Sequence, residues 1–169
     1  MPARLIYLLS VVLALFLAGS VQAVTVTWTD AGGAHNWLTA ANWDIGLLPT
    51  SADTTVIKML PGPTIANEGA QSGVLRVGAG SAAGALTVDG GTLTTATNLH
   101  VAQAQGSEGT LTMISGAMTI GNNFVVGLSG LAALNMTDGT IAVGGDFRVA
   151  NDSTAKGHVN LDGGVITAN

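Results

Sequence analysis

From Gly84 to the end of the chain, apolar residues occur in pairs whose members are two positions apart. A spacing of two is the period of a β-strand and not of an α-helix. Three such pairs make one unit, and the unit returns about every 24 residues, which indicates a solenoid. The first members of the pairs form three columns, namely Leu86, Leu111, Leu134 and Val159, then Leu93, Met118, Ile141 and Ile166, and then Leu75, Leu99, Phe124 and Phe147.

Turn-forming sequences separate the pairs. Asp-Gly-Gly, Ser-Gly, Gly-Asn-Asn and Gly-Gly-Asp supply tight corners at low conformational cost. Three strands and three corners per unit predict an all-β fold, a parallel β-helix (β-solenoid) with about three strands per rung of about 24 residues. A leucine-rich repeat would need a helical segment and an asparagine ladder, and a β-propeller blade would need about 40 residues. The rungs are expected over residues 64–169, with an incomplete last rung.

One of the three corners varies in length. The stretch from Val101 to Leu111 is longer than that from Val126 to Leu134, whereas the offsets within the pairs stay constant. We therefore expect one loop per rung to bulge outward.

Residues 1–23 have the pattern of a secretory signal peptide. Arg4 precedes an apolar run from Leu5 to Ala18, and small residues follow up to Ala23. The alternative is a membrane anchor, but about 14 apolar residues fall short of the roughly 20 that span a bilayer. We expect a secreted or cell-surface protein with no membrane insertion after cleavage.

The net charge narrows the classes of partner, and the absence of cysteine limits how the fold can be stabilised. The chain has a net charge of −5, with ten acidic and five basic residues, which argues against nucleic acid and against an anionic membrane surface. It has no cysteine, so core packing and stacking alone must stabilise it. This fits a bacterial exported protein somewhat better than a eukaryotic one.

Residues 24–63 differ in composition from the repeats and contain all three tryptophans, Trp28, Trp37 and Trp43. One interpretation is an N-terminal cap, because an open β-helix end exposes apolar side chains and free strand edges. The other is a carbohydrate contact, with the three rings stacking on sugar faces. The position just ahead of the first rung favours the cap.

Two features of the mature chain resemble a known group of proteins. The first consists of Trp28, Trp37, Asn42-Trp43, Gly46, Pro49, Asp53 and Val56-Ile57. This segment resembles the opening of many bacterial exported β-helix proteins. The Gly-rich repeats are similar to those of autotransporter passenger domains and related surface proteins of environmental bacteria. The resemblance implies cell-surface display, adhesion or matrix building, with catalysis in only some members.

An enzyme is the main alternative, because polysaccharide lyases and hydrolases often use this fold. Such enzymes need clustered acids beside Arg or Lys. Asp89, Asp138 and Asp162 each precede a glycine, so corners are the favoured interpretation. Asp146 and Asp152 flank a strand that carries Arg148, which is the only acid–base grouping visible in the sequence, and we interpret it as a solvated strand face.

Other site chemistry has little support in the sequence. His35, His100 and His158 lie in unrelated contexts, so we predict neither a metal site, nor a catalytic triad, nor a cofactor. A minor alternative is ice binding by outward threonine columns. The columns are Thr87 and Thr112, continued by Asn135 and Asn160, and Thr94, Thr119 and Thr167, interrupted by Ala142. Threonine is also a common residue on exposed strands.

The favoured hypothesis is a non-catalytic, exported structural or adhesive β-helix module of a bacterial surface or secreted protein. Its expected partners are a surface polysaccharide or domains of its own protein. Phe124 and Phe147 are expected to be buried neighbours in adjacent rungs. The columns ending in Phe147 and Ile166 are expected to be partly uncovered, and the open end to self-associate.

Overall fold

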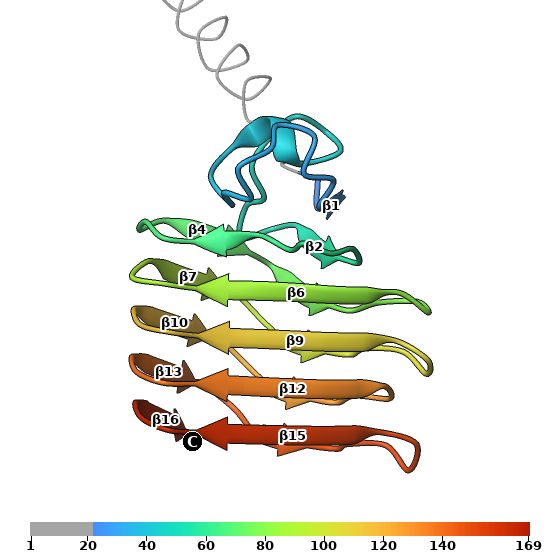
Figure 1. Ribbon diagram of the computed structural model, residues 1–169, viewed down its shortest axis with the longest axis vertical. Helices are drawn as coiled ribbons and strands as arrows, with labels where there is room; N and C mark the ends of the chain where they lie inside the picture. The colour runs from blue at the N-terminus through green and yellow to red at the C-terminus, as the bar shows by residue number, and fades with distance from the viewer. Residues whose placement is uncertain (1–21) are drawn as a thin grey trace, which may run out of the picture.

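The computed structural model describes residues 22–169, which form a rod of stacked rungs with a folded cap at one end (Figure 1). The predicted signal peptide lies outside the described residues, apart from Gln22 and Ala23. In the described part of the chain, the only helical element is one 3₁₀ turn, η1 (Ala40–Asn42). The predicted all-β class is confirmed.

Three parallel sheets run along the rod, and each rung contributes one strand to each sheet. Sheet A has six strands: β1 (Thr25–Thr27), β2 (Thr54–Ile57), β5 (Val74–Val77), β8 (Leu99–Val101), β11 (Phe124–Val126) and β14 (Phe147–Val149). Sheet B has five: β4 (Ala70–Ser72), β7 (Thr92–Thr95), β10 (Ala117–Ile120), β13 (Thr140–Val143) and β16 (Val165–Ala168). Sheet C has five: the short β3 (Thr64–Ile65) and the four longest strands of the rod, β6 (Ala83–Val88), β9 (Glu108–Met113), β12 (Leu131–Met136) and β15 (Lys156–Leu161).

The strand register confirms the three columns predicted from the sequence. Leu86, Leu111, Leu134 and Val159 are direct partners in sheet C. The column from Leu93 to Ile166 lies in register in sheet B, and the column from Leu75 to Phe147 in sheet A. Alternate residues of each strand point inward, so the three columns meet in one continuous core.

The prediction for the Phe124–Phe147 pair is confirmed for the contact between the rings and wrong for the burial of Phe147. The two rings are neighbours, with centroids 5.1 Å apart, and Phe124 is fully buried. Phe147 is only partly buried, so the expectation that both rings are buried is wrong. Because β14 is the last strand of sheet A, no described strand covers that side of Phe147. Ile166 is likewise partly buried, which confirms the partial exposure expected for the ends of these columns.

The corner between sheets A and C needs a left-handed backbone in four successive rungs. Gly78, Ala102, Gly127 and Ala150, which directly follow the sheet A strands, have φ of 78°, 56°, 83° and 54°. In each rung this conformation lets the corner amide donate to a carbonyl of the preceding rung, as from Ala102 N to Val77 O at 2.7 Å. Glycine adopts this conformation freely, whereas alanine is strained in it.

Replacing Ala150 with glycine should therefore stabilise the protein. Ala150 is exposed, so the substitution removes the strain at φ 54° without removing a buried methyl group. The net gain in the free energy of unfolding should be about 0.5–1 kcal/mol, after the entropic cost of glycine. Chemical denaturation measures it, with Ala142→Gly on the exposed face of β13 as the control that should destabilise. A loss of stability in Ala150→Gly would contradict the strain argument.

The predicted variation in corner length is confirmed. The loop after β8 covers residues 102–107 and the loop after β14 covers residues 150–155, whereas the loop after β11 covers only residues 127–130. A short loop thus lies between two longer loops on one edge of the rod. This difference shapes the surface described below.

The cap is continuous with the rod. β1 and β2 lie within residues 24–63, yet β1 pairs with β2 and β2 pairs with β5, so this segment supplies the first two strands of sheet A. The rest of the segment folds over the top of the stack (Figure 1). It is joined to the first sheet C strand by a bridge between Asn36 and Thr64.

Candidate functional site

The three tryptophans form the interior of the cap. Trp28, Trp37 and Trp43 are 1%, 0% and 2% exposed. Trp43 packs edge-on against both others, with centroid distances of 5.1 and 4.8 Å. Its indole N–H donates to Trp37 O at 2.9 Å, and that of Trp28 donates to Pro61 O at 3.2 Å. Stacking on a sugar requires an exposed ring face, and these rings have none in this structure.

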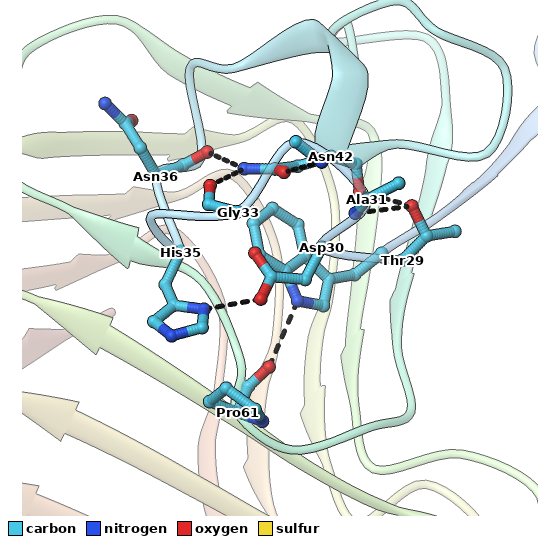
Figure 2. Close-up of polar contacts among 10 residues, drawn as sticks. Thr29, Asp30, Ala31, Gly33, His35, Asn36, Asn42 and Pro61 are labelled. Atoms are coloured by element: carbon cyan, nitrogen blue, oxygen red, sulfur yellow. Dashed lines mark hydrogen bonds and ion pairs between the residues drawn. The ribbon is translucent and has the colours of Figure 1, made fainter.

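Two buried polar side chains hold the cap together. The amide of Asn42 accepts from Gly32 N at 2.7 Å and donates to Gly33 O and Asn36 O at 3.2 and 3.0 Å (Figure 2). The carboxylate of Asp53 accepts from Val24 N and from Thr50. Burial raises the pKa of Asp53, but these hydrogen bonds outweigh it and hold the pKa below its ordinary value of 3.8. Both residues therefore have structural roles.

The side chains of Asp30 and His35 contact each other in the cap. Asp30 Oδ2 lies 2.6 Å from His35 Nδ1, and both residues have a left-handed backbone (Figure 2). The carboxylate orients the imidazole. Within residues 22–169 no group of three or more potential metal ligands occurs, so this pair has no partners for a metal centre.

One hollow on the rod lies beside the short corner loop. It has a volume of about 270 Å³, and Leu131 is among the residues that line it. Hydroxyl and amide side chains from this loop and its two neighbours line it, namely Gln105, Ser107, Ser129 and Thr154. A second hollow of about 240 Å³ adjoins it and shares Glu108 and Leu131. We refer to the two together as the notch.

The notch carries three ionisable side chains on two sheet C strands. Glu108 and Lys156 line the first hollow, and Glu108 and His158 line the second. Glu108 and Lys156 are both direct register partners of Leu131, one rung to either side. The sequence analysis did not identify this set of ionisable side chains. Glu108 and Lys156 are 48 positions apart in sequence, and two turns of the solenoid place them on one face, two rungs apart.

The acid–base grouping that the sequence suggested consists of Asp146, Arg148 and Asp152, and two of these residues form a surface ion pair. Arg148 contacts the carboxylate of Asp146 two residues away, and both side chains are about half exposed. Asp152 instead accepts hydrogen bonds from Ser129 and Asn151, which lower its pKa. Asp89, Asp138 and Asp162 are exposed in corners, as the turn interpretation predicted.

Polar residues lie in register just before the strands of sheet A and on its outer face. The side chain of Asn98 accepts from Asn123 N at 3.1 Å, and that of Asn123 accepts from Asp146 N at 3.0 Å. This short asparagine ladder was not foreseen from the sequence. On the same face Arg76 is the direct partner of His100. Burial, and then the positive charge of Arg76, lower the pKa of His100 below 6.5.

Stability should fall on acidification below about pH 6.5 because of His100. Its folded-state pKa is lowered, so the unfolded chain takes up the proton first, and the proton uptake favours unfolding. Above pH 6.5 both states are neutral at this residue and the effect vanishes. His100→Gln should flatten the loss of stability between the folded-state pKa and pH 6.5, as measured by denaturation at several pH values. The same pH dependence in His100→Gln as in the parent would refute this assignment.

These features define the class of the protein, which is a capped parallel β-solenoid. Within residues 22–169 no helix is long and apolar enough to cross a membrane. No family model, curated protein or solved structure matches the chain.

The outward threonine columns are in register, with the Ala142 and Asn135 interruptions that the sequence indicated.

Proposed function

We propose that this chain is a non-catalytic, exported structural and adhesive β-solenoid module of a bacterial surface or secreted protein. The observation that carries the proposal is the unbroken rung-to-rung register of all three sheets. Such a register makes an extended rod with long outer faces, which suits display and contact over a surface. The resemblance of the Trp-rich opening and the repeats to exported β-helix proteins gives further support, as does the signal pattern of residues 1–23.

The expected adhesive partner is a surface polysaccharide. To test this, the mature chain is immobilised and exposed to extracted bacterial polysaccharides, and retention is compared with that on a protein-free surface. A second assay displays the chain on a non-adherent bacterium and measures its attachment to polysaccharide-coated surfaces. Retention and attachment that both equal the blank would overturn the adhesive part of the proposal.

The last described rung is proposed to associate end to end with a second copy. Its inward-facing side chains Val149 and Leu161 are 44% and 53% exposed, and β14, β15 and β16 each leave one strand edge unpaired. Apolar side chains beside free strand edges favour pairing with another chain. We expect concentration-dependent dimers in analytical ultracentrifugation, abolished by Leu161→Lys. A monomer at every concentration would contradict this prediction.

The alternative function is a polysaccharide lyase or glycoside hydrolase. The observation that favours it is the notch, where Glu108, Lys156 and His158 place an acid, a base and an imidazole on one face. Incubation with acidic and neutral polysaccharides, followed by an assay of new reducing ends, tests it. Cleavage that is lost in Glu108→Gln and Lys156→Gln would establish the enzyme in place of the scaffold.

A further inference from the structure

The notch contains two opposite charges that lack partners. Within residues 22–169 the ion pairs are Asp30 with His35 and Asp146 with Arg148, so neither Glu108 nor Lys156 takes part in one. Both side chains are exposed and project from the outer face of sheet C. Charges in this arrangement are available to a ligand.

The solenoid sets the spacing of the two backbone positions. Glu108 and Lys156 are two rungs apart, which places their backbones about 10 Å apart along the rod. Between them lies Leu131, whose side chain is 52% exposed. When both side chains extend straight out from the sheet, a ligand that contacts both charges carries a cation and an anion about 10 Å apart, joined by a segment that tolerates an apolar surface.

We infer that the notch binds a short peptide through its two charged ends. Three extended residues span about 10 Å, which matches the separation of the two backbone positions from which the side chains extend. The peptide ammonium would lie at Glu108, its carboxylate at Lys156, and its middle residue over Leu131. This binding site is independent of the proposed adhesive role.

The size and lining of the notch agree with a ligand of this class. The hollows of about 270 and 240 Å³ lie below the roughly 300–1,000 Å³ of sites for drug-sized molecules. Gln105 lines the first hollow and has an amide that can bond a peptide group. A polyanion would be repelled by Glu108 and by the net charge of −5.

Titration of the isotope-labelled mature chain with trialanine, followed by NMR amide shifts, tests the inference. We expect shifts at Glu108, Leu131 and Lys156, with a dissociation constant on the order of 10 mM or higher, because exposed ion pairs contribute only about 0–1 kcal/mol each. N-acetyl-trialanine and trialanine amide should each bind several-fold more weakly. Blocked peptides that bind as well as trialanine would overturn the inference.

Charge variants sharpen the test. Glu108→Gln and Lys156→Gln should each weaken trialanine binding several-fold, whereas Glu68→Gln and Lys58→Gln, at exposed positions outside the notch, should not. The double variant Glu108→Lys with Lys156→Glu should bind again, because the peptide can lie in the opposite direction. Failure of the exchanged pair to bind, in a protein with an unchanged amide spectrum, would overturn the inference, as would a saccharide that shifts the same amides while trialanine does not.

Discussion

Phe124→Ala should lower the free energy of unfolding by about 3–5 kcal/mol, the usual cost of deleting a buried phenyl ring. Phe124 is 0% exposed and lies in register between Leu99 and Phe147 in the sheet A column. Strands above and below fix the backbone through parallel pairing, so the cavity cannot close by local collapse. Chemical denaturation monitored by the far-ultraviolet β signal measures the loss.

Phe147→Ala is the matched control for this prediction. Its ring belongs to the same column and contacts Phe124, but it is only partly buried because β14 is the last strand of the sheet. Less apolar area returns to water on truncation, so the loss should be clearly smaller than for Phe124→Ala. Equal losses in the two variants would mean that the end of the rod is covered in solution.

The core of the fold could be predicted from the sequence because it repeats. Leu86, Leu111 and Leu134 occupy one column in sequence, and each is a direct strand partner of the next. A parallel solenoid converts sequence period directly into spatial register, so no long-range inference was needed. The exposure of Phe147 was misjudged because burial of a column end depends on the neighbouring rung and not on the residue type.

The site could not be predicted in the same way. Glu108 and Lys156 are unremarkable in sequence. They line the same hollow because the strand register places them on either side of Leu131, beside a loop that is shorter than its neighbours. The indication of a hollow at this place was the unequal length of the corners, which is visible in the sequence. For the tryptophans the sequence favoured a cap over a sugar contact because of their position, and packing and two indole hydrogen bonds place them inside the cap.

Gly78→Ala should be the most damaging change at the corner between sheets A and C. Gly78 has a φ of 78°, which costs alanine about 1–2 kcal/mol. A Cβ at this position would also meet the carbonyl oxygen of Glu108 well inside van der Waals contact, and would lie 3.1 Å from Gly109 Cα. Overpacking against backbone adds about 1–3 kcal/mol, so the total loss should be about 2–5 kcal/mol.

Gly127→Ala in the same corner column separates backbone strain from steric overlap as causes of the lost stability. Its φ of 83° gives the same strain, but the nearest atom to an added Cβ is Lys156 O at 3.1 Å, which a small shift of the backbone relieves. Gly127→Ala should therefore cost only about 1–2 kcal/mol. The chain already carries Ala102 and Ala150 at this position in other rungs, so the conformation itself is tolerated. If both variants lost the same stability on denaturation, the backbone of Glu108 would not limit the space at Gly78, and strain alone would explain the corner.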